Sequence, residues 1–183
     1  IVILGLVKPG EHIITSKIEH PAILEPCRER EKEGGEVTYL DVDSKGLVSV
    51  EEVKKAIKEN TRLISIMYVN NEIGTIQPIE EIGKLVREIN KERKNKIYFH
   101  TDAVQASNYC EMNVDKLGVD LVSISGHKIY GPKGIGVLYR RAGTPIKPIQ
   151  FGGHQEKGVR PGTLNVPGIV GLSKAVELII KDK

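Results

Sequence analysis

The sequence predicts an α/β protein built on a mostly parallel, mixed sheet with helices on both faces. Short apolar, β-branched segments alternate with segments of helical spacing, and this alternation is typical of parallel strands joined by crossover helices. Thr61–Val69 is so apolar that we expect both faces of that strand to be covered. The last two strands meet at Gly131-Pro132-Lys133-Gly134, which is too short for a crossover helix, so we expect that pair to be antiparallel.

Turn and cap residues divide the first half of the chain into elements. Residues 1–7 are apolar and closed by Lys8-Pro9-Gly10, which is typical of the last turns of a helix. Pro21 opens a helix because proline is tolerated in the first turn, and Ser49 is a predicted N-cap followed by acidic residues. The expected elements are strands at 12–16, 36–42 and 61–69 and helices at 21–32 and from 50 to about 59.

The second half continues the alternation. Ile82, Leu85, Val86 and Ile89 stand at helical spacing after Pro78, and the basic residues from 90 to 96 are predicted to be a solvated extension of that helix. The other expected elements are strands at 97–101, 121–125, 135–140 and 146–150, a short connection at 114–119, a glycine-rich loop at 152–162 and a helix at 168–180.

The composition of the chain argues against two classes of function, nucleic-acid binding and membrane association. The formal net charge of +3 is small and the basic residues are scattered among acids, while aromatic residues make up only 4% of the chain, so we expect no nucleic-acid surface. No apolar run approaches the roughly 20 residues that cross a bilayer, so we expect no membrane partner. Cys27 and Cys110 have no metal or redox spacing and suit a reducing cytoplasm.

Lys128 follows the predicted strand 121–125, at the kind of sheet edge where open α/β proteins bind ligands. One interpretation is a solvated surface lysine, as most lysines are. A phosphate loop fits poorly, because Lys133 stands one place too late after Gly126 and Gly131 and no serine or threonine follows it. The third interpretation is a Schiff-base lysine, whose amine becomes nucleophilic when burial or charge lowers its pKa.

Five motifs, taken together and in order, resemble the NifS/IscS-type cysteine desulfurases, the group I branch of the class V aminotransferase-like enzymes. They are Glu19-His20, residues 69–74 (VNNEIG), residues 101–105 (TDAVQ), residues 125–136 (SGHKIYGPKGIG) and the segment from Gly152 to Thr163. The resemblance implies that residues 1–183 are the large, cofactor-binding domain of a fold-type I pyridoxal-phosphate enzyme. It also leads us to expect that both ends of this domain, and the small C-terminal domain, are absent.

The resemblance assigns roles to residues around pyridoxal 5'-phosphate. Lys128 is implied to carry the cofactor covalently, and His20 to stack on its ring and move protons. Asp102 is implied to pair with the pyridine nitrogen, which keeps the ring able to accept electrons. Gln105 is implied to bond the ring phenolate oxygen, and Asn71 to lie near the cofactor oxygen and the substrate carboxylate.

The phosphate contacts follow from the same resemblance. Ser125 and His127 are implied to bind the phosphate, with Gly126 allowing the backbone to approach, and Thr163 to reach a phosphate across a dimer interface. Three of the cofactor-contacting residues also have a simpler interpretation from the sequence alone. Asp102 can be a buried paired carboxylate or, with His100, part of a metal site, although two ligands are too few; His20 can be structural, and Asn71 can serve turn formation.

The implied activity converts L-cysteine to L-alanine and leaves a persulfide for iron–sulfur cluster or thiolated-cofactor synthesis. The implied partners are L-cysteine, a second subunit in a homodimer, and a sulfur-acceptor or scaffold protein. Neither Cys27 nor Cys110 matches the family's sulfur-accepting cysteine, so we expect cofactor binding without a complete desulfurase site. The alternatives are a selenocysteine lyase, a small-substrate aminotransferase, or a non-catalytic dimerisation or binding fragment.

Overall fold

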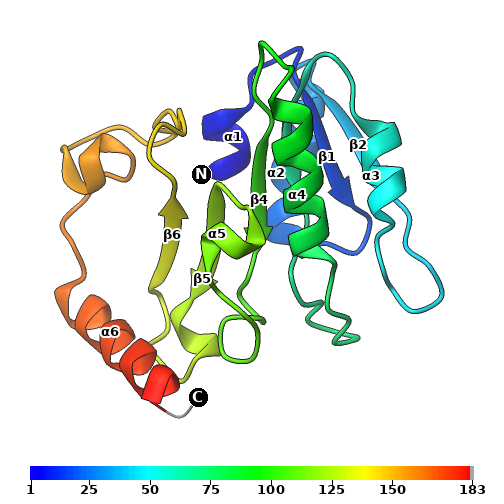
Figure 1. Ribbon diagram of the computed structural model, residues 1–183. Helices are drawn as coiled ribbons and strands as arrows, with labels where there is room; N and C mark the ends of the chain where they lie inside the picture. The colour runs from blue at the N-terminus through cyan, green and yellow to red at the C-terminus, as the bar shows by residue number, and fades with distance from the viewer. Residues whose placement is uncertain (182–183) are drawn as a thin grey trace.

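Six strands form one sheet in the order β2-β1-β3-β4-β5-β6 in the computed structural model, which describes residues 1–181 (Figure 1). Strands β1 to β5 pair in parallel, and β6 pairs with β5 in the antiparallel direction, so both sequence predictions are confirmed. The strands are β1 His12–Ser16, β2 Glu36–Leu40, β3 Thr61–Ser65, β4 Tyr98–Asp102, β5 Leu121–Ser125 and β6 Gly136–Arg140.

Helices cover both faces of the parallel strands, as the alternating apolar side chains require. On one face lie α1 (Val2–Leu6) and α2 (Pro21–Lys32), and on the other lie α3 (Val50–Ala56), α4 (Ile79–Asn90) and α5 (Val114–Leu117). Alternate residues of each strand belong to different cores. Ile13, Leu63, Tyr98 and Leu121 pack with α1 and α2, whereas Ile14, Ile64, Phe99 and Val122 pack with α3 to α5.

The last helix, α6 (Val166–Lys181), lies apart from the sheet (Figure 1). Leu172 and Ala175 of α6 pack against Ile129 of the loop that follows β5. The helix begins two residues before the predicted position. Among the described residues, no helix has the length and apolar character needed to cross a membrane.

The chain reverses its direction of winding between β1 and β3. From β1 it moves outward to β2, and it then returns to place β3 on the other side of β1. The parallel strands bring their carboxyl ends to one edge of the sheet. In open α/β sheets this edge, near such a reversal, is where ligands bind.

Strand β3 is shorter than predicted, because a side chain replaces the neighbouring strand at its carboxyl end. The pairing of β3 with β1 stops at Ser65, four residues before the predicted end. Beyond it, the Met67 N–H donates to Glu19 Oε1 (2.9 Å), while the Tyr68 N–H still donates to the Asp102 carbonyl of β4 (2.9 Å). The backbone therefore stays extended without forming a ladder on both sides.

Four other predictions needed correction. The strand expected at 146–150 is wrong: Lys147 N donates one backbone hydrogen bond to the Gly5 carbonyl (2.8 Å), and no strand lies beside it. Residues 114–117 form the short helix α5 rather than a plain connection, because the Asn113 side chain caps it by accepting from the backbone of Asp115 and Lys116. Helix α3 ends three residues early and strand β2 two residues early.

Candidate active site

The carboxyl edge of the sheet gathers most of the predicted site residues. His20 follows β1, Asn71 follows β3, Asp102 ends β4 and Ser125 ends β5. Asp102 and Ser125 occupy alternate positions with Tyr98 and Leu121, so they share the α1 and α2 face of the sheet. The fold thus places side chains from four separate segments at one edge.

Asp102 is a half-buried carboxylate that forms no salt bridge with a side chain of residues 1–181. Its Oδ1 accepts a hydrogen bond from the Val104 N–H (2.9 Å), which is the one hydrogen bond that the described residues give this carboxylate. Burial raises the pKa of Asp102, while the Val104 N–H and the nearby His20 oppose that rise. A partly buried anion is stabilised by a positive partner, so this site suits a ligand with a cationic ring nitrogen.

His100 lies two residues before Asp102, on the same face of β4, and is fully buried. Its Nδ1 is 2.8 Å from Ser65 Oγ, and its Nε2 is 2.9 Å from Ser123 Oγ. Burial lowers its pKa to about 3, so the ring is neutral. Both ring nitrogens are already used, which argues against the metal alternative for His100 and Asp102. Within residues 1–181 no group of three His, Cys, Asp or Glu side chains could hold a metal ion.

His20 is the N-cap of α2, and this role fixes its tautomer. Its Nδ1 accepts a hydrogen bond from the Ala22 N–H (3.1 Å), so the neutral ring carries its proton on Nε2. The ring is exposed, and its influence on the Asp102 pKa shows that the two side chains lie near each other. The structure therefore leaves the Nε2–H of His20 to face a ligand.

Lys128 ends a single 3₁₀ turn, η1 (Gly126–Lys128), directly after β5. It lies at the carboxyl edge, the position predicted from the sequence, and its side chain is exposed, as in the solvated-lysine interpretation. Ser125 Oγ and His127 Nδ1 lie 2.8 Å apart in the same turn. If the serine hydroxyl donates to Nδ1, the Nε2–H of His127 can donate to an anion.

Gly126 allows close packing of the chain around it and offers a ligand neither open space nor a hydrogen bond. A Cβ at this position would come within 2.9 Å of Ile135 Cγ2 and 3.0 Å of the Pro132 carbonyl oxygen. The Gly126 N–H itself donates to the Ile135 carbonyl (3.0 Å) and so is not available for a phosphate. Tyr130 adopts a left-handed φ of 63°, a strained conformation for a residue with a side chain.

The remaining predicted residues are less closely gathered. Asn71 is exposed in the loop after β3, and Gln105 is half-buried in the turns after β4. Thr163 is exposed between η2 (Gln155–Gly158) and α6, a segment that Figure 1 shows on the outer side of β6. One copy of the chain does not bring Thr163 to the other site residues, and its role across a dimer interface stays a prediction.

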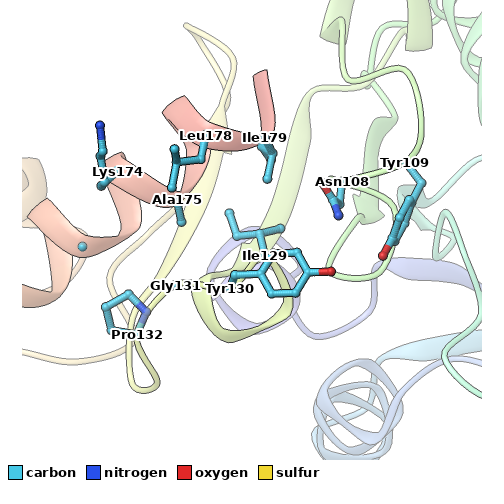
Figure 2. A pocket seen from close by; sticks show the side chains of 11 residues that line it. Asn108, Tyr109, Ile129, Tyr130, Gly131, Pro132, Lys174, Ala175, Leu178 and Ile179 are labelled. Atoms are coloured by element: carbon cyan, nitrogen blue, oxygen red, sulfur yellow. The ribbon is translucent and has the colours of Figure 1, made fainter. Parts of the chain in front are cut away.

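A separate hollow lies between α6 and the loop after β5 (Figure 2). Tyr130 and Tyr109, whose phenol groups point toward each other, line one side, and Ala175 and Leu178 of α6 line the other. None of the residues that line it is a predicted site residue. We therefore place the candidate site at the carboxyl edge and not in this hollow.

Glu19 is a residue of the site that sequence reasoning missed. It is only 4% exposed, and its Oε1 accepts from Ser16 Oγ (2.7 Å) and the Met67 N–H (2.9 Å). Burial, and to a smaller degree Asp102, raises its pKa to about 8. The available signal was its place directly before His20 at the end of a strand, but a single sequence does not reveal that a carboxyl group is buried.

Known proteins resemble this chain over nearly its full length. The sequence model of the aminotransferase class-V family matches residues 1–183. The cysteine desulfurase IscS of Dictyoglomus turgidum is 56% identical over 179 residues, and that of Methanosarcina thermophila is 57% identical over 169 residues. These alignments cover 98% and 92% of this chain but 44% and 40% of the relatives, so the chain spans less than half of their length.

Solved structures agree with the sequence relatives. A protein described as NifS-like superposes with a TM-score of 0.88 at 46% identity, covering 96% of this chain and 47% of that one. A structure described as SspA in complex with cysteine has a TM-score of 0.86 at 48% identity, covering 91% of this chain and 47% of the other. The chain therefore belongs to the class V aminotransferase family, whose members are pyridoxal-phosphate enzymes.

Proposed function

We propose that residues 1–183 form the cofactor-binding large domain of a pyridoxal-phosphate-dependent cysteine desulfurase. The proposed reaction converts L-cysteine to L-alanine and transfers the sulfur to an enzyme thiol as a persulfide. The observation that carries the proposal is Asp102, a half-buried carboxylate that has one hydrogen bond and no salt bridge within residues 1–181, at the same edge as His20 and Lys128. The names of the relatives and the cysteine-bound relative support the choice of substrate.

Bound pyridoxal phosphate supplies an electron sink for the substrate carbon. The chain's residues fit its parts. Asp102 would hold the positive charge of the ring nitrogen, and Gln105 would donate to the ring oxygen. Lys128 would provide the amine for covalent attachment, since the η1 turn presents it at the carboxyl edge.

The η1 turn would also bind the phosphate group. Ser125 Oγ and His127 Nδ1 bond to each other, so the neutral pair would offer one hydrogen to the phosphate: the Nε2–H of His127 when Ser125 donates, or the O–H of Ser125 when Nδ1 carries the proton. Gly126 would support this turn indirectly, because its lack of a side chain lets Ile135 and Pro132 pack against it, and its own N–H stays bonded to Ile135. Asn71, in the exposed loop after β3, would contact the cofactor oxygen and the substrate carboxylate.

His20 would stack on the cofactor ring and present its Nε2–H to the ligand. The basic nitrogen of the neutral ring is Nδ1, which accepts the cap bond from the Ala22 N–H, so the ring would take up a proton only when that cap bond opens. This arrangement also explains why the helix starts at Pro21. A proline at the first helical position has no N–H to satisfy, and the histidine caps the next one.

The partners and the location belong to the same proposal. We infer a homodimer in which Thr163 reaches the phosphate of the other subunit, because its segment lies away from the site of its own chain. We further infer a sulfur-acceptor or scaffold protein, delivery to iron–sulfur or thiolated-cofactor synthesis, and a cytoplasmic location. Cys27, which is buried and has its pKa raised to about 12, is not the accepting thiol.

The test is to load the protein with pyridoxal phosphate, reduce it with borohydride and map the labelled peptide. We expect the label on Lys128 and none on Lys133, an exposed lysine in the following turn that serves as an internal control. The Lys128→Ala variant should lose the label. A label on another lysine, with Lys128 unmodified, would contradict the proposal, whereas alanine and sulfide release by the full-length protein would identify the reaction.

A further inference from the structure

Two buried side chains, Glu19 and Asn70, join the loops that follow β1 and β3. They are 4% and 6% exposed, and neither is among the residues proposed to contact the cofactor. The two loops flank the point where the winding of the sheet reverses. Each of the two residues directly precedes a proposed ligand contact, since His20 follows Glu19 and Asn71 follows Asn70.

Glu19 connects the loop after β1 to the backbone after β3. Its Oε1 accepts from Ser16 Oγ (2.7 Å), at the end of β1, and from the Met67 N–H (2.9 Å), two residues beyond the end of β3. This position is where backbone pairing between the two strands has already stopped, because their ladder ends at Ser65. The carboxyl group thus takes the place of the missing strand pairing.

Asn70 connects the same two loops, but its side chain comes from the loop after β3 and bonds to the loop after β1. Its Nδ2 donates to the Ile18 carbonyl (2.9 Å) and lies 3.4 Å from Met67 Sδ. Its Oδ1 accepts from the N–H groups of Glu72 (2.9 Å) and Ile73 (3.0 Å), which folds the turn that carries Asn71. One amide therefore fixes both the shape of the second loop and its distance from the first.

We propose that Glu19 and Asn70 are positioning residues, a buried clamp that sets the spacing of His20 and Asn71 across the cofactor site. The inference rests on the proposed function, because it assigns the clamp a purpose toward the same cofactor. With no backbone pairing beyond Ser65 on this side, the hydrogen bonds of these two side chains hold the loops together. Loss of either side chain leaves His20 and Asn71 free to separate.

The clamp works with Glu19 as a neutral acid. Its Oε2 is buried and has no hydrogen-bond partner within residues 1–181, and burial raises the pKa of the group to about 8. The titratable groups near it are Asp102 of β4 and Cys27 of α2, and neither supplies a positive charge. A neutral Glu19 leaves Asp102 as the carboxylate that faces the cofactor nitrogen, and it makes glutamine a faithful replacement.

The experiment compares four variants of the pyridoxal-phosphate-loaded protein: Glu19→Gln, Glu19→Ala, Asn70→Ala and the control Asn90→Ala. Asn90 makes the same kind of two-way bridge, donating to the Ile97 carbonyl (2.8 Å) and accepting from its N–H (2.9 Å), but at the amino end of β4. For each variant we would measure the cofactor Kd, the absorbance of the bound cofactor from pH 6 to 9, and the Tm.

We expect Asn70→Ala and Glu19→Ala to raise the Kd about tenfold, the equivalent of one hydrogen bond, and to shift the absorbance–pH curve. Glu19→Gln should keep the wild-type Kd and the wild-type curve at pH 7, and Asn90→Ala should lower only the Tm. The clamp is overturned if Asn70→Ala has the Kd and absorbance curve of Asn90→Ala, a comparison that holds even if Glu19→Ala fails to fold. A wild-type protein that binds no cofactor would instead contradict the proposed function and the clamp with it.

Discussion

The two edges of the sheet use polar side chains in different ways. At the amino edge, the polar groups bond to one another: His12 lies 2.8 Å from both Thr61 Oγ1 and Thr38 Oγ1, and Asp120 accepts from the Phe99 N–H and from Lys96. At the carboxyl edge, Asp102 has a single hydrogen bond from residues 1–181, and Lys128 is exposed. Similar residue types thus bond to one another at the amino edge, whereas at the carboxyl edge they leave hydrogen-bonding and charged groups for a ligand.

The two histidines that flank β1 make the contrast most clearly. His12 begins the strand, is fully buried with both nitrogens bonded, and has its pKa lowered to about 4, first by burial and then by Lys58. His20 follows the strand, is exposed and uses only Nδ1 in a helix cap. A histidine that satisfies both nitrogens is structural, and one that keeps a nitrogen for the outside is suited to proton transfer.

The strongest test of this contrast is Asp102→Asn. We expect turnover in the full-length protein to fall by roughly 10²- to 10⁴-fold, because the loss of a partner for a charged ring nitrogen is worth about 3–5 kcal/mol. The Tm should change little, since burial already disfavours the ionised carboxylate. Cofactor occupancy, alanine and sulfide release and Tm would be measured on the same samples, and a variant with full turnover would refute the role of Asp102.

The second test compares the two histidines directly. His12→Ala should reduce the free energy of unfolding by about 2–4 kcal/mol, because it removes a fully buried ring and its two hydrogen bonds to threonine hydroxyls, and should leave the cofactor Kd unchanged. His20→Ala should lose about 0.5–2 kcal/mol of helix capping but roughly 10²-fold in turnover. Urea unfolding and turnover assays separate the two outcomes. Equal effects of both variants on turnover would remove the distinction between the edges.

The fold could be predicted largely from the sequence because its signals are local. Apolar strands between turn residues set the five parallel strands, and the short connection at 131–134 set the direction of β6. The errors arose where a distant group decides the outcome. Glu19, 48 residues away in sequence, takes over the pairing of Met67 and shortens β3. The segment at 146–150 has strand-like residues but no neighbouring strand to pair with.

The site was predictable in position but not in its supporting interactions. Lys128, Asp102 and His20 follow from strand ends and from the family motifs, and the structure places them at one edge. The sequence does not show that the Gly126 N–H is already bonded to Ile135, or that Glu19 is buried. Both facts depend on which segments meet in three dimensions, and periodicity carries no information on that.

The pH dependence of stability gives a third test. In a plot of stability against pH, His12 at the amino edge controls the acid limb, where stability falls as the pH falls, and Glu19 at the carboxyl edge controls the alkaline limb, where it falls as the pH rises. Between pH 6.5 and about 4 the unfolded chain protonates His12 while the folded chain does not, so stability falls as the pH falls, by up to about 1.4 kcal/mol per unit. His100, with its pKa lowered to about 3, acts in the same direction. Glu19 has its pKa raised to about 8, so between pH 4.5 and 8 the folded chain keeps a proton that the unfolded chain has lost, and stability falls as the pH rises.

Above pH 6.5 the histidine effect ends, and the Glu19 effect alone continues to about pH 8. We therefore expect maximal stability near pH 6.5. His12→Gln should flatten the acid limb, and Glu19→Gln should flatten the alkaline limb. Urea unfolding at pH intervals of half a unit would measure both slopes. An alkaline limb that is unchanged in Glu19→Gln would show that this carboxyl group is ionised in the folded protein.

The smallest expected effect is that of Cys27→Ala. Cys27 lies on α2, on the face of the sheet that carries Asp102, yet it is fully buried, and burial followed by Glu19 and Glu31 raises its pKa to about 12. A thiol that stays protonated at neutral pH is a poor nucleophile, so turnover in the full-length protein should be unchanged and the free energy of unfolding should fall by about 1 kcal/mol. Cys110→Ala, which changes a half-buried cysteine in the turns after β4, is the matched control. Sulfide and alanine release would be followed in both variants beside the absorbance of the bound cofactor. If Cys27→Ala alone abolished turnover while its Tm and cofactor absorbance stayed normal, the buried Cys27 thiol would be the sulfur acceptor. For that role, nearness to the carboxyl edge would then matter more than exposure to solvent.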